Sequence, residues 1–391
     1  MVRNTARVAE LRKSTATVHF PGLNAFRFVA ATVVVLVHIA LVQKELRISS
    51  FLVPIPQSVG GLAVTFFFVL SGFLITYLLL HERAASGTVD VGKFYWRRIL
   101  RIWPLYYLIL FLAFVFLNNR ALLPSIADPA VYKQAPTNIA LYLVLLPSLA
   151  FTYNMQILYA NQLWSVGVEE QFYLVWPLFM KRLGRSGQFY SMLALVVGFV
   201  LVRNGTALLI WFLPEYDQVL YRFIALLTIT RIDCMAIGGL GAYALYYHPQ
   251  WVHRFISSVY VDIVVLITVL VLASRDTFIP YIHHEFYSVL FCYVILSGSC
   301  KPGSILQLKG KTWDWLGKLS YGIYMWHMAV IALAQFAIKT FAITQHATIN
   351  WMLYTSVVPA TILVSWLSYQ FIEQPFLKIK SRFVVVKSCA A

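Results

Sequence analysis

Charged residues are scarce in this chain of 391 residues, where they make up 12% of the sequence. A soluble domain typically has about 25% charged residues. Hydrophobic residues reach 60%, and apolar runs recur along the whole length. These runs approach about 20 residues, which suits a membrane-spanning helix and is too long for a barrel strand. The composition therefore predicts an all-α fold, a polytopic transmembrane helical bundle.

Acidic residues are also few, 15 against 31 basic ones, and the net charge is +16. The basic residues cluster in short loops between apolar runs, which is typical of cytoplasmic loops in membrane proteins. No RNA- or DNA-binding motif is present, so we expect membrane lipids as partners and no nucleic acid. The four cysteines show no metal-ligand spacing, and we expect no metal site and no required disulfide.

The distribution of positive charge predicts about ten spans with both termini cytoplasmic. The expected spans are 23–43, 60–80, 103–118, 164–180, 187–213, 219–247, 257–274, 280–299, 319–339 and 350–373. A basic cytoplasmic segment, 1–22, precedes a membrane domain at 23–377, and a cytoplasmic tail follows at 378–391. No strong internal repeat is visible, which speaks against an inverted-repeat transporter.

The segment 138–153 is the ambiguous part of this topology, because it is short and contains Pro147. A full span here would place Lys181, Arg182 and Arg185 outside the membrane, whereas a re-entrant or peripheral segment keeps them inside. We prefer the second interpretation, since irregular backbone is tolerated at membrane depth where protein covers it.

The first apolar run carries two ionisable residues, Arg27 and His38. Their positions differ by eleven, which is about three helical turns. Both residues therefore lie on one helix face and are roughly 16 Å apart along the axis. Such groups usually face a bundle interior or a water-filled cavity, which indicates a buried working site. The alternative is an arginine that reaches the membrane surface and a histidine that is hydrogen-bonded to a neighbouring helix.

A second cluster contains Arg98 and Arg101, three residues apart and therefore on one helix face. Arginine suits phosphate recognition, and the aromatic neighbours could stack on a nucleobase. The cluster could equally be a positive anchor at the membrane surface with an aromatic belt.

A third cluster contains Ser165 and Glu169, four residues apart on the same helix face. Glu169 and His38 are expected at the same depth, so the carboxylate could orient the imidazole. The alternative is a helix start, with Ser165 as N-cap and Glu169 near the positive end of the dipole.

Weaker signals come from three more intramembrane ionisable residues. Arg231 and Asp233 could pair with another helix, and His327 is a second buried histidine. For each of them a structural hydrogen bond is the more frequent role. Small residues at Gly60, Gly61 and Gly72 favour close packing of the second helix.

Taken in order along the chain, these motifs resemble those of the acyltransferase-3 family of integral membrane O-acyltransferases, over about residues 20–377. The motifs that carry the resemblance are Arg27 with His38, Phe66 to Ile75, Arg97 to Pro104, Trp164 to Tyr173, Thr230 to Asp233, Leu319 to His327 and Tyr369 to Pro375. Asn24 departs from the pattern, because the family often has Asp at this position.

The resemblance implies that an acyl group, usually acetyl, passes from cytoplasmic acyl-CoA to a hydroxyl of a glycan, a lipid-linked sugar or a glycosylated metabolite. His38 would be the general base or, as an alternative, a transient acyl carrier, with Glu169 orienting it and Ser165 belonging to the same element. Arg98 and Arg101 would bind acyl-CoA, and Arg27 would line its path. Acyl-CoA is then a co-substrate, no cofactor is bound permanently, and the protein is expected in the cytoplasmic membrane of a bacterium.

Two other functions stay open at this point. A proton-coupled transporter or flippase could use the same charges as a proton relay. A non-catalytic scaffold or sensor would tolerate the loss of His38. The acceptor could be an exopolysaccharide, an O-antigen, a lipo-oligosaccharide signal or a macrolide-type natural product.

Overall fold

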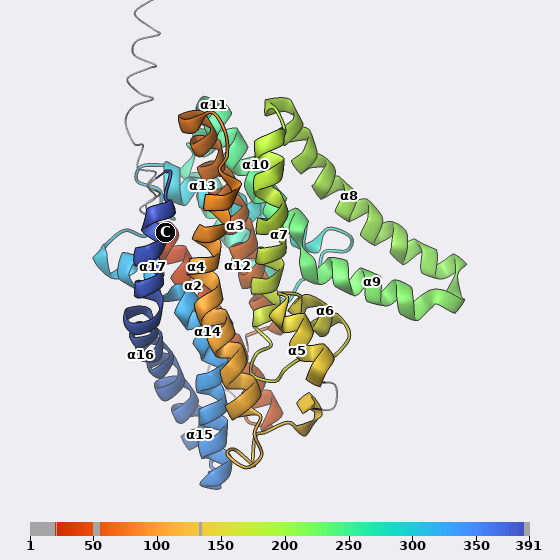
Figure 1. The fold of residues 1–391 in the computed structure, drawn as a ribbon, viewed down its shortest axis with the longest axis vertical. Helices are drawn as coiled ribbons and strands as arrows, with labels where there is room; N and C mark the ends of the chain where they lie inside the picture. The colour runs from red at the N-terminus through yellow and green to blue at the C-terminus, as the bar shows by residue number, and fades with distance from the viewer. Residues whose placement is uncertain (1–19, 21, 50–54, 133–134, 387–391) are drawn as a thin grey trace, which may run out of the picture.

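The computed structural model describes residue 20 and residues 22–49, 55–132 and 135–386. All regular elements in this part of the chain are helical, which confirms the predicted all-α class. Most of the long helices run roughly along the long axis of the molecule (Figure 1). The predicted basic segment 1–22 lies outside the described residues except at positions 20 and 22, and the tail is described only to residue 386.

Six helices form the part of the bundle that holds the site. They are α2 (Leu23–Glu45), α3 (Gln57–Ser86), α4 (Val91–Phe111), α7 (Leu163–Arg182), α10 (Ile232–Tyr247) and α14 (Lys311–Thr340). Helix α3 packs against α2, α7 and α10, while α14 packs against α2 and α4. Helix α3 is therefore central, and 78% of its most apolar stretch is buried inside the protein.

The remaining helices surround this group. They are α5 (Ala135–Leu143), α6 (Pro147–Thr152), α8 (Arg185–Phe212), α9 (Asp217–Thr230), α11 (Pro249–Phe255), α12 (Val259–Ser274), α13 (His283–Cys300), α15 (His346–Met352), α16 (Val358–Ser368) and α17 (Gln374–Lys380). A short π-helical segment continues α4 at Leu112–Leu117. Two more join α15 to α16 at Leu353–Val357 and α16 to α17 at Tyr369–Glu373. Helices α8 and α9 lean out from one side of the bundle (Figure 1).

Seven helical segments in the described residues are long and apolar enough to cross a membrane, and an eighth is the pair α11 and α12, bent by 72°. The expected ten spans would also require α7 and α13. Both contain several ionisable residues, among them Glu169 and Glu170 in α7, and neither reaches the same apolarity. The count of about ten is therefore not confirmed, and the orientation of the termini stays a prediction.

The segment 138–153 folds as parts of two short helices, α5 of nine residues and α6 of six. At a rise of about 1.5 Å per residue, neither can cross a hydrocarbon core of about 30 Å. Pro147 begins α6, and its δ-carbon packs where Gly167 of α7 leaves room. The segment therefore covers α7 locally, as the preferred interpretation expects.

The expected span 219–247 lies within one candidate membrane span, Pro214–Tyr247, in which the regular helix is interrupted at Arg231. Arg231 ends α9 and precedes α10 with φ 40° and ψ 38°, a left-handed conformation that is uncommon outside glycine. Its guanidinium donates to the carbonyl of Gly61 at 2.9 Å and to Thr65 Oγ1 at 3.0 Å. These contacts fasten the interruption between α9 and α10 to α3.

Helices α3 and α10 approach so closely that backbone touches backbone. A Cβ atom on Gly72 would collide with the carbonyl of Met235, and one on Gly238 would collide with the carbonyl of Val69. Small residues allow this approach, as the sequence indicates for Gly72. The crossing fixes the position of α3 and of the side chains that α3 contributes to the site.

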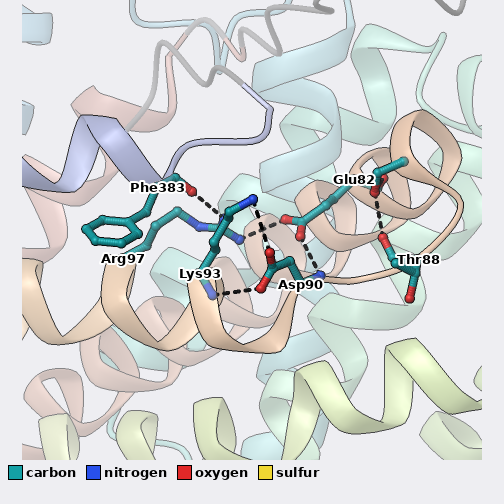
Figure 2. A network of polar contacts seen from close by, with 7 residues as sticks. Glu82, Thr88, Asp90, Lys93, Arg97 and Phe383 are labelled. Atoms are coloured by element: carbon teal, nitrogen blue, oxygen red, sulfur yellow. Dashed lines mark hydrogen bonds and ion pairs between the residues drawn. The ribbon is translucent and has the colours of Figure 1, made fainter.

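A polar network closes the turn between α3 and α4 (Figure 2). Glu82 pairs with Arg97 at 2.8 Å and accepts the backbone N–H of Asp90 at 2.9 Å. Asp90 caps α4 by accepting the backbone N–H of Lys93, and this hydrogen bond lowers the pKa of Asp90. Arg97 also donates to the carbonyl of Phe383 at 2.9 Å. The network therefore ties the turn to the C-terminal segment.

Candidate functional site

A narrow cavity of about 120 Å³ brings together the three arginines singled out in the sequence. We call it the arginine cavity. Its polar lining comes from α2, α3, α4, α7 and α14, and includes Arg27, Ser71, Arg98, Arg101, Glu169 and Tyr173. The predicted grouping of Arg98 and Arg101 on one face is confirmed, and Arg27 faces the same space.

Glu169 is held in the arginine cavity by two hydroxyl groups. Ser71 of α3 donates to Oε1 at 2.8 Å, and Tyr173, one turn further along α7, donates to Oε2 at 3.0 Å. Both carboxylate oxygens are thus occupied and oriented. Because α7 begins at Leu163 and has no side-chain N-cap, Ser165 and Glu169 do not serve as the helix cap that the alternative interpretation required.

Arg98 lies between two aromatic rings, with its Cζ 5.5 Å from the ring centres of both Phe94 and Tyr173. Cation–π contacts of this kind hold the planar guanidinium in place. The buried Nε of Arg98 has no hydrogen-bond partner among the described residues. A fixed cation with an unused donor suits an anionic ligand.

A second and larger cavity, of about 570 Å³, contains His38, and we call it the histidine cavity. Amide side chains dominate its polar lining: Gln57, Gln156, Asn161, Gln162 and Gln335, with Glu45, Arg231 and Lys339. The side-chain oxygens of Asn161 and Gln162 are buried without hydrogen-bond partners among the described residues. Free amide oxygens could accept hydrogen bonds from a hydroxylated ligand.

His38 is oriented by its own helix and by a second histidine. Its Nδ1 lies 2.9 Å from the carbonyl of Val34, which can only accept, so Nδ1 carries the proton and Nε2 keeps its lone pair in the neutral ring. The ring of His327 packs edge-on against it, with 4.9 Å between centres. His327 is fully buried and its Nδ1 donates to the carbonyl of Tyr324.

The expected pairing of His38 with Glu169 is corrected by this geometry. The two residues line different cavities, and both oxygens of Glu169 accept from other groups. His327, expected to be a supporting polar residue, takes the place next to His38. Arg27 and His38 do share one face of α2. Arg27 lines the arginine cavity, however, whereas His38, further along the helix, lines the histidine cavity.

The two cavities share a wall. Among the described residues, Val64 and Tyr324 line both of them. The hydroxyl of Tyr324 lies 2.6 Å from Ser165 Oγ, and Ser165 lines the arginine cavity. Ser165 therefore supports the wall between the cavities, and among the described residues its side chain forms no hydrogen bond with His38 or Glu169.

Arg231 and Asp233 have separate surroundings, and Arg231 forms no ion pair with another helix in the part of the chain that the structure describes. Arg231 lines the histidine cavity beside Trp164, with its Cζ 5.7 Å from the ring centre, and bonds to α3 as described above. Asp233 is 1% exposed and faces Glu285, which pairs with Arg203 at 2.7 Å. Asp233 thus belongs to a structural cluster away from both cavities.

Sequence reasoning missed three contributors to the site: Ser71, Tyr173 and Tyr324. Tyr173 lies four residues after Glu169, which is the spacing of neighbours on a helix face. Tyr324 lies one turn before His327 in the same way. Ser71 has no comparable local signal, because it approaches Glu169 from another helix.

Comparisons with known proteins agree with these features. The acyltransferase-3 family, described as an acyltransferase domain, matches residues 20–370. The putative peptidoglycan O-acetyltransferase YrhL of Bacillus subtilis (strain 168) is 29% identical over 81% of this chain and 50% of its own length. The O-acetyltransferase OatA of Staphylococcus aureus (strain NCTC 8325 / PS 47) is 25% identical over 96% of this chain and 60% of its own length. The chain thus spans between half and three fifths of these relatives, and no solved structure matches it.

Proposed function

Because the chain belongs to the acyltransferase-3 family, we propose that it is a multi-pass membrane O-acetyltransferase of the bacterial cytoplasmic membrane. It moves an acyl group, in the simplest case acetyl, from cytoplasmic acyl-CoA to a hydroxyl of a glycan. The names of the relatives, O-acetyltransferase and putative peptidoglycan O-acetyltransferase, support this choice of reaction and of acceptor class.

The observation that carries the proposal is the pair of cavities on either side of Val64 and Tyr324. The arginine cavity offers cations and aromatic rings, which suits the phosphates and the base of coenzyme A. The histidine cavity offers amide oxygens and an imidazole, which suits a sugar hydroxyl. One substrate therefore binds on each side of a thin wall, and the thioester reaches that wall from the arginine side.

In the proposed reaction the acceptor hydroxyl lies against Nε2 of His38. The hydroxyl oxygen attacks the thioester carbonyl, its proton passes to Nε2, and a carbon–oxygen bond forms. The carbon–sulfur bond then breaks, and the proton on His38 neutralises the departing thiolate of coenzyme A. His327 keeps the imidazole in its plane, while Arg27, Arg98 and Arg101 hold the donor. No permanently bound cofactor takes part in this scheme.

The test is a transfer assay with the purified full chain in lipid nanodiscs. Acetyl-CoA labelled in the acetyl group is incubated with short glycan chains, and the glycan is recovered and treated with mild base. We expect label on the glycan that base releases, as for an O-ester. If no acetyl group is transferred and the protein instead drives proton-coupled uptake of a sugar into proteoliposomes, the proposal is refuted and the protein is a transporter.

A further inference from the structure

Lys380, the last residue of α17, is a buried lysine without an anionic partner. Its exposed fraction is 8%, whereas lysine is almost never fully buried unless it is paired. No hydrogen bond or ion pair joins its ammonium group to any described residue. The charges that act on it most strongly are those of Arg101 and Arg98, followed by Arg97 and Arg27, all of the same sign.

A polar network around Arg97 fastens the segment that follows Lys380 (Figure 2). Arg97 donates to the carbonyl of Phe383, three residues after Lys380, and the ring of Phe383 stacks on Trp96 with 6.0 Å between centres. Glu82 pairs with the other side of Arg97. The C-terminal segment is therefore fastened to α4, the helix that carries Arg98 and Arg101, and α17 itself packs against α4.

Among the described residues, no carboxylate forms an ion pair with Arg98, Arg101 or Lys380. Glu169 is hydrogen-bonded to two hydroxyl groups, and Glu170 accepts from the indole of Trp103 at 3.0 Å. Glu373 acts on Arg101 electrostatically, yet no ion pair within 4 Å joins the two. In the described part of the chain, Arg98, Arg101 and Lys380 form no ion pair at all. Buried charges of one sign are costly unless an ion of the opposite sign joins them.

We propose that Lys380 is the fourth cation of a polyphosphate-binding site whose other members are Arg27, Arg98 and Arg101. The C-terminal segment is then part of the binding site. The ligand class is an organic molecule with several phosphate charges, because a single carboxylate could not balance the three cations that form no ion pair among the described residues. The assignment of this ligand as the acyl donor rests on the proposed function, whereas the anion site itself does not.

The test compares Lys380→Gln with Lys378→Gln in the full chain in nanodiscs. Lys378 is the matched control, because it lies on the same helix and is exposed. The probes are inorganic pyrophosphate and coenzyme A, titrated at fixed ionic strength. We expect Lys380→Gln to weaken the binding of both probes at least tenfold, about 1.4 kcal/mol, and Lys378→Gln to stay within twofold of wild type.

A third variant, Lys380→Arg, separates charge from folding. It should bind pyrophosphate within about threefold of wild type, and all three variants should share the melting temperature of wild type within a few degrees. Equal affinities for Lys380→Gln and Lys378→Gln, or a wild-type protein that binds neither probe, would overturn the inference. Pyrophosphate binding that depends on Lys380 in a protein without acetyl transfer would leave the anion site standing and remove the proposed function.

Discussion

Replacing His38 with alanine is the most direct test of the histidine cavity as the place of proton transfer. The hydrogen bond from Nδ1 to the Val34 carbonyl leaves Nε2 as the basic atom, and no other histidine among the described residues lines this cavity. Loss of a general base typically lowers the rate 10²- to 10⁴-fold, which corresponds to about 2.7 to 5.4 kcal/mol of barrier. We expect kcat of His38→Ala to fall within this range.

The same substitution should leave the fold intact. His38 is half-buried and faces a cavity that already exists, so its removal enlarges open space instead of creating a closed void. The KM for acetyl-CoA should also stay near the wild-type value, because the arginines lie in the other cavity. His327→Gln removes only the ring that packs against His38, and we expect a smaller loss, about three- to tenfold, together with a displaced pH profile.

The assay is the initial rate of labelled acetyl transfer to glycan at saturating donor, with melting temperature measured on the same preparations. His346→Ala is the matched control, since His346 is exposed at the start of α15. Activity of His38→Ala within about threefold of wild type, roughly 0.65 kcal/mol, would exclude His38 as the base. A rise in KM for the donor with unchanged kcat would instead show that His38 takes part in binding acyl-CoA.

Three further outcomes are expected. Arg98→Ala and Arg101→Ala should each weaken coenzyme A binding about tenfold in a titration. Lysine at either position should restore only part of the affinity, because it lacks the planar guanidinium group. Unchanged affinity in both alanine variants would indicate that the two arginines only anchor the helix at the membrane surface. Gly238→Ala should lower the melting temperature through about 1–3 kcal/mol of overpacking, whereas Gly198→Ala, with open space around it, should not. Ser186→Cys should not react with membrane-impermeant reagents added outside the cell. Reaction at this position would show that α7 crosses the membrane in the opposite orientation.

Much of the arginine cavity could be predicted from the sequence, because its arginines and Glu169 stand at helical spacing within polar motifs. Ionisable groups inside apolar helices usually face the interior of the bundle, which favours a shared polar space for Glu169 and the arginines. The pairing of His38 with His327 could not be predicted in this way. The two residues lie on α2 and α14, and no local pattern links helices that are distant in the sequence.

The break at Arg231 shows a second limit of sequence reasoning. Residues 219–247 form one apolar run with a single ion-pair motif, so periodicity predicts one helix. The left-handed conformation of Arg231 is imposed by hydrogen bonds to Gly61 and Thr65 of α3. A tertiary contact therefore interrupts the regular helix at Arg231, although α9 and α10 still belong to one candidate span.

The wall at Val64 and Tyr324 explains why the two groups expected to act together are found apart. A guanidinium cluster beside His38 would disfavour the protonated imidazole that forms when the acceptor hydroxyl is deprotonated. In the proposed function, Tyr324 and Val64 separate the phosphates of the donor, which stay with the arginines, from the imidazole of His38. Only the uncharged acyl end then has to reach the wall between the cavities. The proposed function therefore assigns the phosphorylated donor to the cavity that contains Glu169 and the neutral sugar to the cavity that contains His38.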